Sequence, residues 1–454
     1  MVLARVGVSR LAGIARDTFR TWQQTASLIA STRGSHSREA HRPSANESPH
    51  LLLLARFLPP VINGGVYRPT ELLRAAARQG WQVTAISQLA PAEPSDAGLE
   101  LVRSVPASVR LTHFEPPPAR DPSHFFSPRL SGGFGNIEPI ITAALRECAA
   151  HRPTAVMASG PPFAEFVAAL VLSREWDVPL VLDYRDEWTE CPFQFVGVGN
   201  VDRYWEARCL SKAALVCFTT ESQRAHQISA FPQLGPARTM VAPNGWEEHH
   251  SGSSPATVLT PGVATIAFLG LLAEHCDLPE FLATLERVMT LTPATAQRIQ
   301  FAFVGRKTTT EQQLLERFSR PALLRDIGHV PLSEAQAIMR TSDALLLFNV
   351  PRLARYIPGK AYDYIAAGRR ILLYGQGGEL ERLLSEYPPA IRVERGDPQA
   401  LASAMAKIAA AKVEPGTSDG SEFVARHRRS LSAERQLAAI ERVARQNRSG
   451  HPVA

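Results

Sequence analysis

The 454-residue sequence lacks any apolar run long enough to form a membrane-spanning helix. Near the start, the longest uninterrupted apolar run covers only 51–55, whereas a helix needs about 20 apolar residues to cross a bilayer. The early segment also lacks a compact hydrophobic region followed by a cleavage site, which argues against a secretory signal. We therefore expect a cytoplasmic chain that does not cross a membrane.

Cysteine is scarce, and its spacing excludes two kinds of site. The five cysteines form an odd set without a CxxC pair, which argues against a disulfide framework and against a zinc cluster. They are Cys148, Cys191, Cys209, Cys217 and Cys276. No Asp-x-Asp pair stands in a suitable loop either, so we expect neither a metal ion nor a cofactor.

Signals of nucleic-acid binding are also missing, although the formal net charge is +6. Basic and aromatic residues do not interleave as they do in single-strand binders, and no helix-turn-helix or RNA-binding motif is present. A nucleic-acid partner is therefore not expected. Anionic lipid or a phosphorylated substrate would account for the same charge.

What the sequence does have is the composition of a globular protein with more than one domain. Hydrophobic residues make up 45% and charged residues 20%, close to the average of soluble proteins. The length exceeds that of one ordinary domain. We predict a basic extension over 1–48, a first domain over 49–248, a linker over 249–262, a second domain over 263–430, and a final helix with a tail over 431–454.

The extension carries seven arginines and only three acidic residues, and it contains a helical stripe of apolar side chains. The stripe consists of Val8, Leu11, Ala15, Phe19, Trp22, Ala26 and Ile29. A basic amphipathic helix of this kind can lie on an anionic membrane, which would place the protein on the inner face of the membrane. Alternatively, the stripe packs on the body of the protein.

Both predicted domains alternate apolar strands with helices. In the first we expect strands at 51–57, 81–87, 154–158, 179–183 and 215–219, with helices at 70–79, 137–151 and 163–174. In the second we expect strands at 265–270, 299–304, 344–349 and 370–374, with helices at 278–289, 311–318, 333–340 and 360–367. Apolar strands separated by helices are typical of a parallel sheet covered on both faces. The expected fold class is α/β, with two Rossmann-like, doubly wound domains facing a central cleft.

Two glycines and three charged residues follow strands of the first domain. Gly64 and Gly65 stand where a strand turns into a helix, where a backbone approaches a ligand most closely, although a glycine pair also serves in ordinary loops. Asp183, Arg185 and Asp186 follow a very apolar strand and therefore lie at the edge of the sheet. They either contact the substrate or form an internal ion-pair network that holds the loop.

The most specific segment lies in the second domain, where Pro358 and Gly359 begin a short helix. Its free N–H groups suit a pyrophosphate, and Lys360 in the first turn would neutralise phosphate charge. Asp363 lies one turn further along the same face and would accept both hydrogens of a ribose diol. The alternative is that Lys360 and Asp363 form only an intrahelical ion pair.

Seven segments in the same order resemble the GT-B fold glycosyltransferases of the family 4 type, with a glycosyltransferase 4-like N-terminal domain. These segments are the loop at 64–65, SGPPF at 159–163, DYRDEW at 183–188, PNG at 243–245, FLG at 268–270, FVG at 303–305 and GKAYDYIAAG at 359–368. The resemblance covers the chain from about Leu51 to the C-terminal helix. The stretch 433–445 resembles the final helix of this family, which returns to the N-terminal domain.

The resemblance implies a donor site and an acceptor site. Asp363 would stand in the position of the ribose-binding glutamate, and Lys360 would face the phosphates. The implied donor-binding set is Gly64, Gly65, Asn244, Gly270, Gly305, Lys360, Asp363 and Gly378, and the implied catalytic set is Asp183, Arg185, Asp186 and Lys360. The chain departs from typical members at Arg355, where they carry a glutamate, and at Leu271, where many place an arginine.

We therefore expect a retaining, metal-independent glycosyltransferase of the hexosyltransferase type. Its donor would be a nucleotide-diphosphate sugar, and its acceptor a sugar or lipid-linked hydroxyl in the synthesis of cell-surface glycans or glycoconjugates. Two alternatives stay open on the same scaffold. One is a sugar-nucleotide epimerase or phosphorylase, and the other is a non-catalytic paralogue that binds nucleotide sugar.

Overall fold

A computed structural model describes residues 48–90, 93–116, 136–192, 200–247, 259–260, 262–293, 298–410 and 421–449. Within these residues the chain divides into two compact units. The first runs to Pro243 and resumes at Ser432, and the second runs from Asn244 to Leu431. The apolar stripe predicted in the extension and most of the predicted linker lie outside the described residues. No helix among the described residues is long and apolar enough to cross a membrane.

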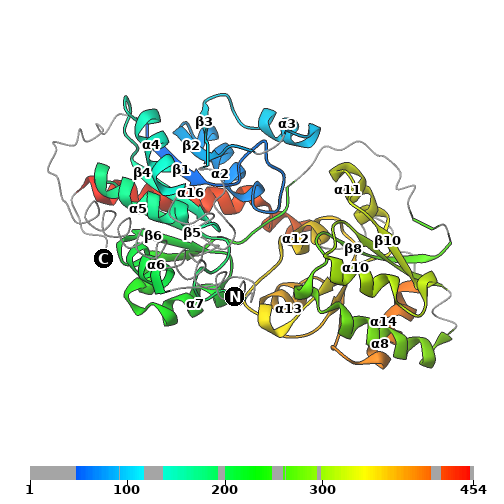
Figure 1. The fold of residues 1–454 in the computed structure, drawn as a ribbon. Coiled ribbons are helices and arrows are strands. Elements are labelled where there is room, and N and C mark those ends of the chain that lie inside the picture. The colour runs from blue at the N-terminus through cyan, green and yellow to red at the C-terminus, as the bar shows by residue number, and fades with distance from the viewer. Residues whose placement is uncertain are drawn as a thin grey trace, which may run out of the picture. The chain divides into compact units, whose positions relative to one another are not determined.

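The first unit contains a seven-stranded parallel sheet with the order β3-β2-β1-β4-β5-β6-β7 (Figure 1). Its strands are β1 (His50–Ala55), β2 (Gln82–Gln88), β3 (Val109–Phe114), β4 (Ala155–Gly160), β5 (Leu180–Tyr184), β6 (Leu215–Phe218) and β7 (Thr239–Val241). Its helices are α2 (Tyr67–Arg78), α3 (Asp96–Arg103), α4 (Ile137–Glu147), α5 (Ala164–Trp176), α6 (Asn200–Lys212), α7 (Glu221–Ala230) and, from Ser432 on, α16 (Arg429–Arg448). The strand order reverses between β1 and β4, which places a topological switch point there.

Strand β1 shows why this sheet is covered on both faces. Its four consecutive leucines are fully buried, and alternate side chains of a strand point to opposite faces. Leu52 and Leu54 belong to the core cluster that includes residues of α4, α5 and α6. Leu51 and Leu53 belong to the cluster that includes residues of α2 and α16. An uninterrupted apolar run is therefore what a central strand between two helical layers requires.

The second unit contains a six-stranded parallel sheet with the order β10-β9-β8-β11-β12-β13. Its strands are β8 (Ala264–Leu269), β9 (Ile299–Val304), β10 (Leu324–Ile327), β11 (Ala344–Phe348), β12 (Arg370–Tyr374) and β13 (Ala390–Val393). Its helices are α8 (Leu278–Leu291), α10 (Thr309–Glu316), α11 (Leu332–Thr341), α12 (Gly359–Ala366), α13 (Gly378–Ser385), α14 (Pro398–Ala410) and α15 (Ser421–Arg426). One face of the sheet packs with α8 and α14, and the other with α11, α12 and α13.

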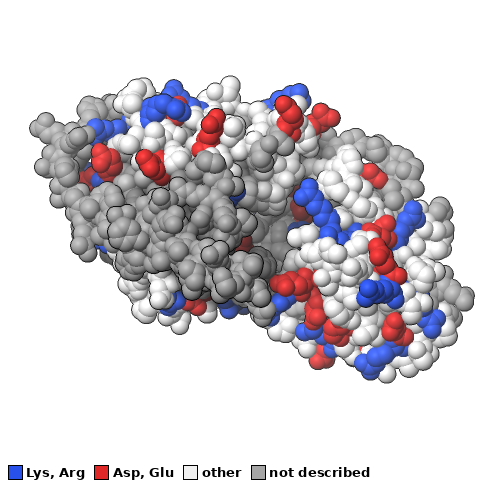
Figure 2. Space-filling view, viewed as in Figure 1, with Lys and Arg blue, Asp and Glu red and all other residues white. Residues whose placement is uncertain are grey.

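Both units are thus doubly wound α/β structures, and the predicted fold class is confirmed. In each unit, the carboxyl ends of the parallel strands meet at one edge, and the loops that carry the predicted site residues begin there. Figure 2 shows basic and acidic side chains interspersed over the described part of the visible face.

Candidate functional site

The carboxyl ends of β8 and β9 are packed against the first turn of α12. Gly270 follows β8 with φ of 120°, and Gly305 follows β9 with φ of 116°. A Cβ atom at Gly305 would lie 2.5 Å from the carbonyl oxygen of Gly270, and one at Gly270 would lie 3.2 Å from Nζ of Lys360. A Cβ atom has no room at Gly305, and at Gly270 the positive φ and the tight contact with Lys360 disfavour one, so glycine lets the two loops and the lysine converge.

Lys360 is a partly buried cation without an anionic partner among the described residues. Its Nζ atom lies 3.7 Å from the centroid of the Phe268 ring, a cation–π geometry. Burial lowers the pKa of this ammonium group to about 8, although the nearby Cys276 thiol acts in the opposite direction. A desolvated cation at the first turn of a helix, beside two glycines at strand ends, is suited to an anionic ligand.

Asp363 faces a different pair of charges. Burial raises the pKa of its carboxyl group to about 6, although the positive charge of Arg429 partly offsets this. Arg429 donates to Glu247 at 2.9 Å, and the Glu247 charge also acts on Asp363. No ion pair joins Lys360 to Asp363 in this part of the chain, so the alternative of a simple intrahelical pair is not what the geometry contains.

Asn244 is half-buried and lies beside the same cluster. Arg429 also donates to the carbonyl of Gly245 at 2.8 Å. The backbone of Gly245 packs against residues 427 and 429 so closely that a Cβ atom would lie 2.6 Å from the carbonyl oxygen of His427. Arg429 therefore ties the segment of Asn244 to the surroundings of Asp363.

Gly378 is explained by packing within the second unit. It begins α13 with φ of 74°, and a Cβ atom there would overlap the carbonyl of Ala354. Glu379 donates its backbone N–H to the same carbonyl at 2.8 Å. The glycine is therefore needed for the close approach of two backbone segments, whether or not a ligand is present.

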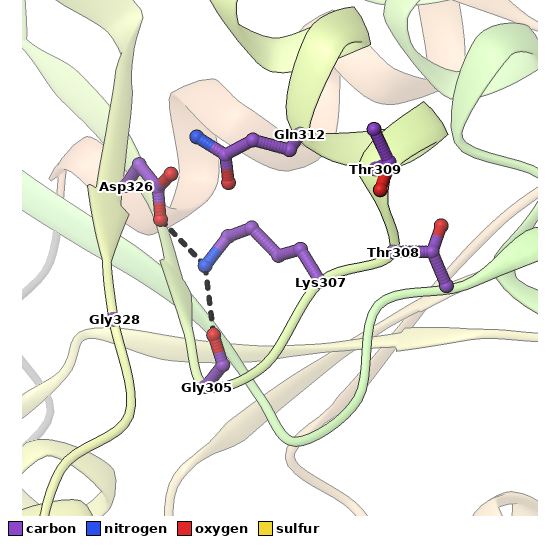
Figure 3. A pocket seen from close by; sticks show the side chains of 7 residues that line it. All are labelled: Gly305, Lys307, Thr308, Thr309, Gln312, Asp326 and Gly328. Carbon is purple, nitrogen blue, oxygen red and sulfur yellow. Dashed lines mark hydrogen bonds and ion pairs between the residues drawn. The ribbon is translucent and has the colours of Figure 1, made fainter.

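A pocket of about 450 Å³ opens next to Gly305 (Figure 3). On one side, Nζ of Lys307 donates to the carbonyls of Gly305 at 2.9 Å and Ile327 at 3.2 Å and pairs with Asp326. The remaining lining combines two glycine backbones with the polar residues Thr308, Thr309 and Gln312. Backbone, hydroxyl and amide groups of this kind can recognise a polar ring.

In the first unit, Asp183 is fully engaged by other side chains of the protein. Its carboxylate accepts from Nη2 of Arg68 at 2.7 Å, from Oγ of Ser159 at 2.8 Å, and from Nε2 of Gln436 at 3.1 Å. Burial alone would raise the pKa of Asp183, but the ion pair with Arg68 outweighs it and holds the pKa below its usual value. These contacts join β5, α2, β4 and α16, which favours the structural alternative for this residue.

Arg185 holds two loops through main-chain carbonyls. Its guanidinium donates to Gly65 at 2.6 Å, to Gly160 at 3.3 Å, and also to Pro161. A Cβ atom at Gly65 would overlap this guanidinium, whereas Gly64 is exposed and has open space around it. The charge of Asp186 acts on Arg185. Gly65 is therefore required by Arg185, and Gly64 is the glycine with room for a ligand.

The structure thus forms three groups from the predicted residues. Gly270, Gly305 and Lys360 converge, Asn244 and Asp363 share the surroundings of Arg429, and Gly65 lies against Arg185. Arg68, Phe268 and Arg429 were not predicted. Their partners lie far away in the sequence, so no local motif indicates these contacts, although Phe268 itself stands in the FLG segment. No cluster of metal-ligating side chains is present in the described ranges.

Comparison with protein families gives a match for the first unit. Residues 63–245 match the glycosyl transferase 4-like domain. No curated protein sequence matches the chain at a significant level. The matched range contains the loop of Gly64 and Gly65 and the segment from Asp183 to Asp186.

Comparison with solved structures covers both units. Anabaena HepE in complex with UDP and glucose is similar with a TM-score of 0.54, at 14% identity over 86% of this chain and 98% of that chain. WaaG, a glycosyltransferase involved in lipopolysaccharide biosynthesis, has a TM-score of 0.53 at 13% identity over 87% and 98%. A candidate UDP-N-acetylglucosamine 2-epimerase from Listeria monocytogenes has a TM-score of 0.52 at 12% identity over 87% and 96%. At these identities the likeness establishes the fold alone, which is the GT-B fold.

Proposed function

Because residues 63–245 match the glycosyl transferase 4-like domain, we propose that this chain transfers a sugar from a nucleotide-diphosphate sugar to an acceptor hydroxyl. The observation that carries the proposal is Lys360, a partly buried ammonium group without an anionic partner among the described residues. It lies beside Gly270 at the start of α12. A donor diphosphate supplies the negative charge that this position lacks.

In the proposed reaction, the bond between the anomeric carbon and the diphosphate oxygen breaks, and the acceptor oxygen forms a new bond to that carbon. Negative charge grows on the departing diphosphate, and Lys360 together with the N-terminus of α12 stabilises it. Asp363 accepts the hydrogens of the ribose diol, and the pocket beside Gly305 receives the base. Because protein groups neutralise the leaving charge, the reaction needs no metal ion, and activity should survive excess EDTA.

Finer features of the proposal derive from family likeness. We propose transfer of a hexose with retention of anomeric configuration, for cell-surface glycan or glycoconjugate synthesis. The likeness to WaaG supports that role. Asp183 and Arg185 are assigned to positioning, because their polar atoms hold β4, β5 and the glycine loop. Asp186 and Gly64 stay as positions for ligand contact.

We also propose that the basic extension over 1–48 rests on the inner face of an anionic membrane, close to a lipid-linked acceptor. Deleting 1–48 should weaken binding to anionic liposomes and leave turnover of a soluble acceptor largely intact. Failure of the full-length protein to bind such liposomes would remove this part of the proposal.

A thermal-shift screen against nucleotide-diphosphate sugars tests the donor, because a ligand that binds only the folded state raises the unfolding midpoint. The donor that binds is then incubated with and without acceptor sugars. Transfer that depends on acceptor supports the glycosyltransferase. Conversion of the donor alone would instead favour an epimerase, the second function, to which the likeness to the Listeria protein lends support.

A further inference from the structure

Two opposite charges lie at the switch point of the first sheet, where the chain continues from the parallel neighbours β1 and β4 toward opposite sides of the sheet, to β2 and to β5. Arg56 directly follows β1, and Glu165 lies in the first turn of α5, which follows β4. In doubly wound sheets, ligands bind in the crevice outside the carboxyl ends of the strands at this point. Neither residue belongs to the motifs that the family likeness rests on.

Glu165 is a buried carboxylate that receives no hydrogen bond from any other residue that the structure describes. Only 1% of the residue is exposed, and neither carboxylate oxygen has a hydrogen-bond partner among the described residues. Burial raises the pKa of this group to about 7, and the residue's own backbone N–H and the positive charges of Arg56 and Arg185 only partly offset the burial. A buried polar group left unsatisfied destabilises the fold, so its presence calls for an explanation outside the stability of the unit.

Glu206, in the same unit, is a buried carboxylate whose oxygens accept hydrogen bonds from other residues. Burial raises its pKa to about 7 as well. However, it accepts from Gln227 at 2.8 Å, from Tyr184 at 3.2 Å, and from both the backbone N–H and the hydroxyl of Thr189. The two buried glutamates therefore differ, because Glu206 receives hydrogen bonds from other residues and Glu165 receives none from the residues described.

Arg56 lacks a polar partner as well. It is half-buried, and burial lowers the pKa of its guanidinium. Its charge lies 5.5 Å from the centroid of the Phe57 ring, and it forms neither a hydrogen bond nor an ion pair with any described residue. Arg56 and Glu165 thus influence each other electrostatically without forming an ion pair. Arg185, the other cation near Glu165, is already committed to three carbonyls.

We propose that Arg56 and Glu165 together bind a hydroxyl-bearing ligand, a sugar. A hydroxyl accepts a hydrogen bond from a guanidinium and donates one to a carboxylate, so vicinal hydroxyls satisfy both groups at once. An anion would pair with Arg56 but be repelled by Glu165. A protonated amine would pair with Glu165 but be repelled by Arg56. That this sugar is the acceptor rests on the proposed function, whereas the binding site itself does not.

The site is tested with the full-length protein and four methyl glycosides, those of glucose, galactose, mannose and N-acetylglucosamine, by titration calorimetry and saturation-transfer NMR. At least one glycoside should bind, and Glu165→Gln and Arg56→Met should each raise its Kd by about tenfold or more. Glu206→Gln and Arg78→Met are the matched controls, and they should leave this Kd unchanged. Glu165→Gln should also keep or raise the thermal unfolding midpoint, because it removes a buried charge.

Three results would overturn the proposal. They are the absence of binding by all four glycosides, equal binding by the parent and both variants, and binding of inorganic phosphate that needs Arg56 but not Glu165. The donor is measured separately, through the thermal shift caused by UDP-sugars. If glycosides bind as expected while no nucleotide sugar binds or reacts, the proposed function fails and the sugar site stands.

Discussion

The ammonium group of Lys360 lies against the face of the Phe268 ring, with Nζ 3.7 Å from the ring centroid. The ring compensates part of the charge without supplying a counterion. The Lys360 cation therefore lies near the end of β8 without a counterion among the described residues, and an anionic ligand can supply that counterion. The first prediction follows from this arrangement.

Lys360→Met should lower kcat for sugar transfer by about two orders of magnitude, because the charge it removes is needed most as the diphosphate departs. Steady-state kinetics at saturating donor measures the effect. Circular dichroism must show a native spectrum for the variant. A kcat equal to that of the parent would remove Lys360 from the donor site.

Asp363→Asn should act mainly on the donor KM. The carboxylate binds the ribose in the ground state and in the transition state alike, so its loss weakens donor binding by about 1.5 to 3 kcal/mol with little change in kcat. Titration of the donor against the variant provides the measurement. If kcat falls while the KM is unchanged, Asp363 does not hold the ribose.

The pH profile of kcat/KM for the donor should be bell-shaped. The pKa of Asp363 is raised to about 6, so its ribose-binding carboxylate is lost as the pH falls through 6. The pKa of Lys360 is lowered to about 8, so its cation is lost as the pH rises through 8. Lys360→Met should abolish the alkaline limb and Asp363→Asn the acidic limb. If the alkaline limb remains in Lys360→Met, or the acidic limb in Asp363→Asn, that limb reflects the titration of another group.

The lowered pKa of Lys360 also leads to a prediction for the stability of the protein without ligand. Between pH 8 and 10.5 the folded protein has lost the Lys360 proton, whereas the unfolded chain still carries it. Because the unfolded state then binds more protons, the contribution of Lys360 to the free energy of unfolding rises across this range. Denaturant titrations of the parent and Lys360→Met, compared pairwise at each pH, isolate the contribution. A difference that is constant with pH would contradict the lowered pKa.

The ion pair of Arg68 with Asp183 should be structural. Breaking it with Asp183→Asn or Arg68→Met should reduce the free energy of unfolding by about 3 to 5 kcal/mol, because an unpaired buried charge remains. The double variant should lose less than the sum of the two single changes, and a double-mutant cycle measures the coupling. Strict additivity would show that the two residues act independently.

Substitutions at the adjacent glycines Gly64 and Gly65 distinguish a role in packing from a role in ligand contact. Gly65→Ala places a methyl group against the Arg185 guanidinium and should lower the unfolding midpoint. Gly64→Ala meets open space, so it should leave stability unchanged and raise the KM of a substrate only if that substrate approaches Gly64. Equal thermal stability of both variants would contradict the packing described for Gly65.

The order of strands and helices was accessible from the sequence where apolar runs are long. The strand expected at 51–57 is β1, and the helix expected at 278–289 is α8, each within a few residues. Strand β3 was not predicted, because Val109–Phe114 mixes polar and apolar residues at the edge of its sheet. Apolar runs in the sequence mark strands that are buried, and edge strands are buried least, so their sequence pattern is the weakest.

The candidate site was accessible only where motifs are local. The helix with Lys360 and Asp363 was predicted because the two residues lie one turn apart on a short helix that begins at Gly359. The role of Asp183 depends on Arg68, which lies 115 residues away, and on Gln436, which lies 253 residues away. The unsatisfied carboxylate of Glu165 carries no sequence signal, since only the surrounding fold determines which polar atoms find partners.

Helix α16 has a consequence for the order in which the protein is completed during synthesis. Leu437, Ile440 and Val443 belong to the same core cluster as Leu51 and Leu53 of β1. A ribosome therefore finishes all of the second unit before it delivers the segment that closes the first. Until then, the first unit carries an open apolar face, which gives nascent chains a window for capture by chaperones.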